Sequence, residues 1–108
     1  MPDIFILIHP VGTVLGNANY SDYLVVYQNV TVNTNGIHPP TLGKFVTLGA
    51  GASILGECVI GDRVGIGATV TMRNKRVSDN SVVYRDEMGK IHFRHKDKSF
   101  AENCFVEK

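Results

Sequence analysis

The sequence has no tryptophan, only two cysteines and four prolines, and 8% aromatic residues among its 108 positions. Charge is also scarce: 19% of residues are Asp, Glu, Lys or Arg, and the formal net charge is +1. This balance argues against a nucleic-acid surface built on bulk positive charge. The apolar run at residues 1–8 is too short to cross a bilayer and lacks the basic segment of a signal peptide. We therefore expect neither nucleic acid nor membrane as a partner.

The two cysteines, Cys58 and Cys104, stand far apart and have no metal-ligand spacing. Isolated cysteines of this kind favour a reducing compartment, so we expect a cytoplasmic protein without a bound metal. The length predicts a single domain.

From residue 42 to residue 72, an aliphatic residue or methionine returns at every sixth position. The members are Leu42, Leu48, Ile54, Ile60, Ile66 and Met72, and a second series of small or apolar residues follows four places later at Val46, Ala52, Cys58, Val64 and Val70. A period of six fits neither an α-helix nor simple strand alternation. It is the hexapeptide repeat of a parallel β-helix, so we predict an all-β fold in which both series point into a narrow core. Glycines beside the first series should provide positive φ or allow close backbone approach.

A second phase of the same period precedes this region. It comprises Ile8, Val14, Tyr20, Val26 and Val32, with Gly12, Ala18, Leu24 and Val30 four places after the first four. Because the two phases differ, residues 33–41, which contain Asn, Gly and a proline pair, are predicted to form a loop. Such loops often carry binding residues. We therefore predict a β-helix over residues 1–84, interrupted by a loop at 33–41.

Residues 85–108 are predicted to be a capping tail, since solenoids need ends with a polar outer face. They contain six of the eleven basic and five of the ten acidic residues. Residues 82–84 and 91–93 favour a hairpin, and residues 99–106 a short helix with Ser99 as N-cap. We expect His92 and His95 to be solvated. A small solenoid usually gains from oligomerisation, and Tyr20, Tyr23, Tyr27 and Phe45 are the aromatic candidates for such an interface.

The segment Leu48–Gly56, reading LGAGASILG, with Ile60-Gly61 and residues 66–68 after it, resembles the hexapeptide-repeat acyltransferases. The stretches 9–12 (HPVG), 14–16 (VLG), 28–31 (QNVT) and 38–39 (HP) are similar to the pattern of the serine acetyltransferases among them. The resemblance covers roughly residues 8–72. It implies a single-stranded left-handed β-helix, a homotrimer with active sites between subunits, and acetyl-CoA as co-substrate.

The same resemblance implies roles for individual residues. His9 would be the catalytic general base that removes a proton from an acceptor hydroxyl, and His38 would contact the acceptor. The backbone at Ala50 and Ala68 would bind the pantetheine arm of the coenzyme. Lys75 and Arg76 could meet its phosphates, by charge rather than by motif. On a purely structural interpretation, His9 occupies a corner and His38 packs a loop.

The sequence also departs from the family's pattern. The helical N-terminal domain has no counterpart in these residues, and Ile8 stands where an orienting carboxylate could precede His9. Asp22, Asp3 or an acid from a neighbouring subunit are the candidates to replace it. The acceptor could be serine, a sugar hydroxyl or an amine. A zinc hydratase like the gamma-class carbonic anhydrases needs three histidine ligands, which this spacing disfavours, whereas a catalytically silent scaffold stays open.

Overall fold

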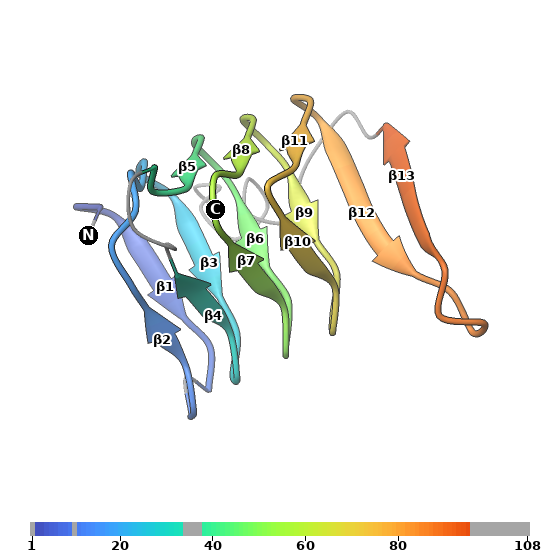
Figure 1. Ribbon diagram of the computed structural model, residues 1–108. Coiled ribbons are helices and arrows are strands. Elements are labelled where there is room, and N and C mark those ends of the chain that lie inside the picture. Colours follow the sequence, from blue (N-terminus) through green and yellow to red (C-terminus); the bar gives the residue numbers. More distant parts are fainter. Residues whose placement is uncertain (1, 10, 34–37, 96–108) are drawn as a thin grey trace, which may run out of the picture.

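A computed structural model describes residues 2–9, 11–33 and 38–95, which contain thirteen β-strands and no helix. The strands wind into a parallel β-helix whose three sheets form the faces of a prism (Figure 1). Sheet A contains β1 (Phe5–Leu7), β3 (Leu24–Val26), β6 (Thr47–Leu48), β9 (Gly65–Ile66), β12 (Ser81–Arg85) and β13 (Ile91–His95). Sheet B contains β2 (Val14–Leu15), β4 (Thr31–Asn33), β7 (Ser53–Leu55) and β10 (Thr71–Arg73). Sheet C contains β5 (Thr41–Leu42), β8 (Val59–Ile60) and β11 (Arg76–Val77).

The core confirms the hexapeptide prediction for residues 42–72. All eleven members of the two series are at most 2% exposed. Similar side chains stack on each other in successive coils, as in the parallel pairs Leu42–Ile60 and Leu48–Ile66. Burying each large aliphatic side chain contributes about 1.5–3 kcal/mol, so the repeat itself is the main source of stability.

The first coil does not follow the predicted phase. Leu7 pairs with Val26 and Leu15 with Val32, so Leu7 and Leu15 take the inward places predicted for Ile8 and Val14. The prediction for these two positions was wrong because the two leucines are eight residues apart rather than six. The first coil has two additional residues at its first corner.

The predicted loop lies between β4 and β5. Asn33 still belongs to β4 and Thr41 begins β5, so the connection is slightly shorter than residues 33–41. Residues 34–37 of it lie outside the described part of the chain.

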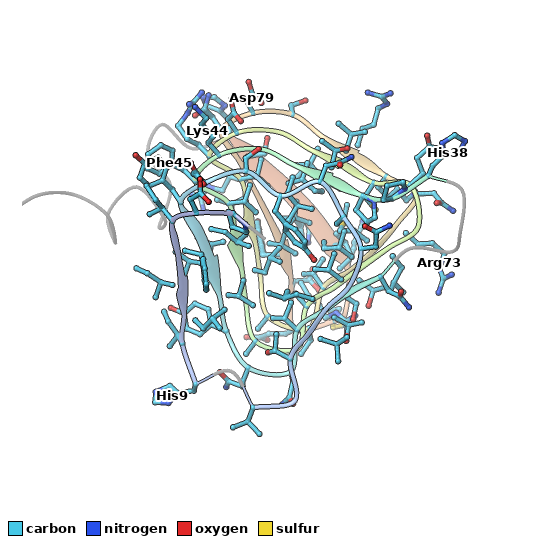
Figure 2. The ribbon with its side chains drawn as sticks, turned by 90° about the vertical axis from the view of Figure 1, so that its left-hand side faces the viewer. His9, His38, Lys44, Phe45, Arg73 and Asp79 are labelled. Atoms are coloured by element: carbon cyan, nitrogen blue, oxygen red, sulfur yellow. The ribbon has the colours of Figure 1, made fainter. Side chains whose placement is uncertain are left out.

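The three corners of the prism are distinct in Figure 2, which looks along the stack of coils. His9 lies at the first corner, where the chain passes from sheet A to sheet B; His38 and Arg73 lie at the second, between sheets B and C. Lys44, Phe45 and Asp79 lie at the third, where the chain returns to sheet A. Residues of different coils that share a corner therefore form a column along the prism.

Aspartates connect the coils at the third corner. Each accepts a hydrogen bond from a backbone N–H one coil earlier: Asp22 from Asp3 and Ile4, Asp62 from Lys44, and Asp79 from Asp62. A β-carbon at Gly43 or Gly61 would collide with the carboxylate of the next coil. These glycines are thus required for close approach, whereas positive φ is carried here by Tyr23, Phe45, Arg63 and Asn80.

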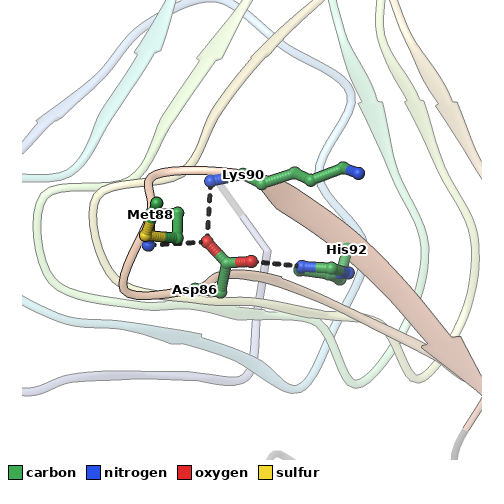
Figure 3. A network of polar contacts seen from close by, with 4 residues as sticks. All are labelled: Asp86, Met88, Lys90 and His92. Carbon is green, nitrogen blue, oxygen red and sulfur yellow. Dashed lines mark hydrogen bonds and ion pairs between the residues drawn. The ribbon is translucent and has the colours of Figure 1, made fainter.

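The predicted hairpin is confirmed: β12 pairs with β13 in antiparallel register, with Val83 opposite Phe93. Its turn is organised by Asp86 (Figure 3). One carboxylate oxygen accepts the N–H groups of Met88 and Lys90, each at 2.9 Å, and the other lies 2.7 Å from Nε2 of His92. The hydrogen bond with His92, followed by that from Lys90, lowers the pKa of the Asp86 carboxyl.

His92 is partly solvated, with 37% of its side chain exposed, but it also has specific partners. Its ring binds Asp86 and stacks on Tyr84, with 5.2 Å between the ring centroids. The helix predicted for residues 99–106 lies outside the described residues, and the boundary between β-helix and tail at residue 84 stays a prediction.

Tyr20 has an unusual environment for a tyrosine hydroxyl. It packs partly against the core, and its hydroxyl donates a hydrogen bond to the carbonyl of Gly16 at 2.8 Å. Burial raises the pKa of Tyr20 from 10.0 to about 12.

We expect one tyrosine of the folded protein to ionise near pH 12, and the Tyr20→Phe variant to lack this step in an ultraviolet titration. The unfolded chain releases this proton near its ordinary value of 10, so the folded state loses stability as the pH rises from 10 to about 12. Thermal unfolding at several pH values should show that Tyr20→Phe loses less stability over this interval. The same ultraviolet titration curve near pH 12 for the unaltered protein and for Tyr20→Phe would contradict this assignment.

Candidate active site

The first corner is held together by backbone hydrogen bonds between coils. Asn29 donates its N–H to Val11, Gly51 to Gln28, and Thr69 to Ala50, at 2.8–3.0 Å. These bonds align one residue of each coil in a column along the corner. The members of the column are Val11, Gln28, Ala50 and Ala68. The column presents small side chains in the third and fourth coils, which leaves the backbone there open to a ligand.

His9 is inserted into this corner. In the later coils the chain passes directly from Tyr27 to Gln28, from Gly49 to Ala50 and from Gly67 to Ala68. In the first coil, Ile8 is equivalent to Tyr27 and Val11 to Gln28. Two additional residues, 9 and 10, separate them in the sequence.

His9 itself has a turn conformation at this corner. His9 has a φ of 48°, and its carbonyl accepts the N–H of Val11 at 2.7 Å. Its side chain is exposed at the corner (Figure 2). Seven other non-glycine residues of the described chain also have positive φ, so this conformation marks His9 as a corner residue and does not by itself indicate a function.

His9, Ala50 and Ala68 therefore share one corner. Coils in such a stack are about 4.8 Å apart, so Ala68 lies roughly 14 Å along the corner from the first coil. A long flexible ligand that follows this edge can contact all three positions.

The two aspartates considered as orienting groups lie elsewhere. Asp22 binds the backbone of Asp3 and Ile4 at the third corner, beyond the opposite end of β1 from His9. The expectation that either Asp3 or Asp22 orients His9 within one chain is thus wrong, because their positions belong to a different column. Where both partners are described residues, His38 contacts Glu57 and His92 contacts Asp86.

His38 lies at the second corner, on the loop that precedes β5. Its Nδ1 is 4.0 Å from a carboxylate oxygen of Glu57 in the next coil. Both side chains are more than 60% exposed, so this contact contributes little to stability. Sequence reasoning missed Glu57, because nothing in the hexapeptide pattern places an acid beside His38.

Lys75 and Arg76 also lie at the second corner, in the turn into β11 and on that strand. Both are exposed, and within one chain they lie at a different corner from Ala50 and Ala68, which follow strands of sheet A. The structure thus divides the candidate residues into a first-corner set (His9, Ala50, Ala68) and a second-corner set (His38, Lys75, Arg76).

A further basic residue continues the first-corner column. Val83 pairs with Ile66, and the backbone of Tyr84 lies beside Gly67, so the next residue, Arg85, is level with Ala68. Arg85 is exposed at the start of the hairpin turn. The sequence alone did not indicate it, since the strand register of the fifth coil was unknown.

Two other kinds of feature are absent from the described residues. No group of three or more His, Cys, Asp and Glu side chains there is arranged to hold a metal ion. Nor does that part of the chain contain a helix long and apolar enough to span a membrane.

Comparison with known proteins gives matches to one group of transferases. Residues 39–74 match the family model described as bacterial transferase hexapeptide (six repeats). A serine acetyltransferase of Synechococcus elongatus is 40% identical over 80 residues, which are 69% of this chain and 33% of that protein.

Solved structures agree with this match. Serine acetyltransferase isoform 3 of Entamoeba histolytica, solved in complex with cysteine, is 32% identical with a TM-score of 0.67, over 80% of this chain and 33% of that one. Neisseria gonorrhoeae serine acetyltransferase is 26% identical with a TM-score of 0.73, over 96% of this chain and 42% of that one.

The matched part of the chain covers 33–42% of the length of these three relatives. The likeness to these structures and the sheet topology confirm the left-handed parallel β-helix that the family resemblance implied. The predicted resemblance is confirmed as well: the chain contains hexapeptide repeats and is similar to the hexapeptide-repeat acyltransferases, and to the serine acetyltransferases among them.

Proposed function

We propose that the protein is an acyltransferase that moves an acetyl group from acetyl-CoA to a hydroxyl group of a small acceptor. The observation that carries the proposal is the insertion of His9 into the column that contains Ala50 and Ala68. The relatives named serine acetyltransferases support the same reaction class. We assign the protein to the cytoplasm, where its co-substrate is available.

His9 is the general base in this proposal. A neutral imidazole removes the proton of the acceptor hydroxyl while that oxygen attacks the thioester carbonyl. The tetrahedral intermediate collapses, the carbon–sulfur bond breaks, and the imidazolium returns the proton to the leaving thiolate. The exposed position of His9 leaves its ring accessible to both substrates.

The coenzyme follows the first corner in this proposal. Its pantetheine arm contacts the backbone at Ala50 and Ala68, where the small side chains permit close approach. Arg85, level with Ala68, meets the phosphates from the same subunit. Lys75 and Arg76, which lie at the second corner, reach them only from a neighbouring subunit.

The second-corner residues enter the site through a homotrimer. In a cyclic trimer each contact is heterologous, so one subunit's first corner faces a different surface of its neighbour. That arrangement brings the neighbour's His38 toward His9, which no single chain does. An acid that orients His9 would also come from the neighbour, and Glu57, beside His38, is the described acid best placed for this role.

The acceptor is serine or a sugar hydroxyl in this proposal. The relatives' names favour serine. A second candidate function is a silent scaffold that binds acetyl-CoA without turnover. It is favoured because, among the described residues, no carboxylate of the same chain pairs with His9.

We predict that His9→Ala lowers kcat about 100-fold or more, because a positioned base contributes roughly that factor. Acetyl-CoA should bind with unchanged Kd, since the arm contacts the backbone of other coils. Steady-state kinetics with serine and with nucleotide sugars, monitored by thiol release, measure the first effect, and calorimetry measures the second. Unchanged turnover would remove His9 from the mechanism; binding without turnover in the unaltered protein would favour the scaffold.

Mixed trimers test whether the site is shared. We expect His9→Ala and His38→Ala to be weakly active alone, and a co-expressed equal mixture to regain activity at about a quarter of the interfaces, where both histidines are intact. A control mixture of His9→Ala carrying two different affinity tags should regain none. A mixture no more active than its components would contradict a site between subunits.

The phosphate assignment is tested with three variants. Arg85→Ala should raise the KM for acetyl-CoA by about 10-fold or more, since a hydrogen bond to a charged group is worth about 1.5–3 kcal/mol. The double variant Lys75→Ala/Arg76→Ala should also raise the KM for acetyl-CoA, because a neighbouring subunit of the trimer contributes these two residues to the site. The matched control is Lys44→Ala, because this exposed lysine lies at the third corner. Equal KM values for Arg85→Ala and Lys44→Ala would exclude Arg85.

A further inference from the structure

Gln28 occupies the first corner in the second coil, between the other members of the candidate site. Backbone hydrogen bonds join its coil to the first coil, which carries His9, and to the third coil, which carries Ala50. Neighbouring coils are about 4.8 Å apart, so Gln28 stands one coil from each. Val26 and Val30, two residues before and after it, are buried in the core, so Gln28 itself lies at the tip of the corner.

The fold does not require an amide at this position. The equivalent turn position holds Ala50 in the third coil and Ala68 in the fourth. Within the described part of the chain, the side-chain amide of the half-buried Gln28 has no hydrogen-bond partner. Its NH₂ group can donate two hydrogen bonds, so it is available to a ligand that lies along the corner.

The adjacent amide, that of Asn29, has a structural place instead. Asn29 has a φ of 56°, and its Oδ1 lies so close to Gly12 of the first coil that a β-carbon on Gly12 would collide with it. The same relation links glycines with aspartates at the third corner. Asn29 therefore supports the turn, and the amide of Gln28 is the better placed of the two to bind a ligand.

We propose that the side-chain amide of Gln28 donates a hydrogen bond to the oxyanion of the tetrahedral intermediate. This inference rests on the proposed function: the coenzyme arm lies along the first corner, its thioester is directed toward His9, and the carbonyl group is therefore level with Gln28. When the acceptor oxygen attacks, the electrons of the C=O bond move to the carbonyl oxygen, and they return when the carbon–sulfur bond breaks. A positioned N–H donor stabilises this negative charge more than it stabilises the neutral thioester.

Gln28→Met tests this role, because methionine keeps the length of the side chain and lacks the amide. We expect kcat for acetyl transfer, measured by thiol release, to fall about 100- to 1,000-fold, the usual effect of removing one oxyanion donor. The Kd of acetyl-CoA, measured by calorimetry, should be unchanged, since the oxyanion does not exist in that complex. Gln28→Ala should behave in the same way, and circular dichroism should show it folded, because Ala50 and Ala68 fill the equivalent position in later coils.

Val11→Ala serves as the control, since it shortens the member of the same column in the first coil without removing a donor. Its kcat should stay close to that of the unaltered protein. Equal kcat values for Gln28→Met and the unaltered protein, or equal losses for Gln28→Met and Val11→Ala, would overturn the assignment and leave the proposed transfer intact. Loss of acetyl-CoA binding in both Gln28 variants would also overturn it, because the amide would then act on the bound substrate. Absence of turnover in the unaltered protein would overturn the proposed function and this assignment together.

Discussion

The stacking of like aliphatic residues in successive coils determines where every other side chain of this protein lies. Leu42 on Ile60 and Leu48 on Ile66 fix the register between coils, and the register decides which residues share a corner. A shift by one residue would turn the inward series toward solvent, which the narrow core does not tolerate. The columns along the corners, and hence the candidate site, follow from this packing.

The corners serve different purposes because each uses different chemistry at the same structural position. The third corner is structural: aspartates bind the backbone of the preceding coil, and glycines leave room for them. The first corner instead has small residues in its later coils and an inserted histidine in its first. An insertion that the core does not require is where a function is most easily accommodated on a regular solenoid.

The sequence predicted what depends on the period and failed where the period changes. Hexads from Leu42 to Met72 were placed correctly, because burial in a narrow core constrains each position. Ile8 and Val14 were placed wrongly, because the two additional residues at 9 and 10 shift the phase of the repeat. A regular period of six gives no sign of where such an insertion occurs. Contacts set by three-dimensional turns, such as that of Asp86 with His92, were also beyond the sequence. The residue types of the candidate site were predictable from the family resemblance. The division of these residues between two corners was not.

The proposed function requires that the coenzyme lies along the first corner. A crystal structure of the protein with coenzyme A bound would test this most directly. We predict that the thiol arm lies beside the backbone of Ala50 and Ala68 and that its sulfur is directed toward His9. The side chain of His38 from a neighbouring subunit should be close to it. A coenzyme bound along the second or third corner of the same subunit, with His9 remote from the sulfur, would contradict it.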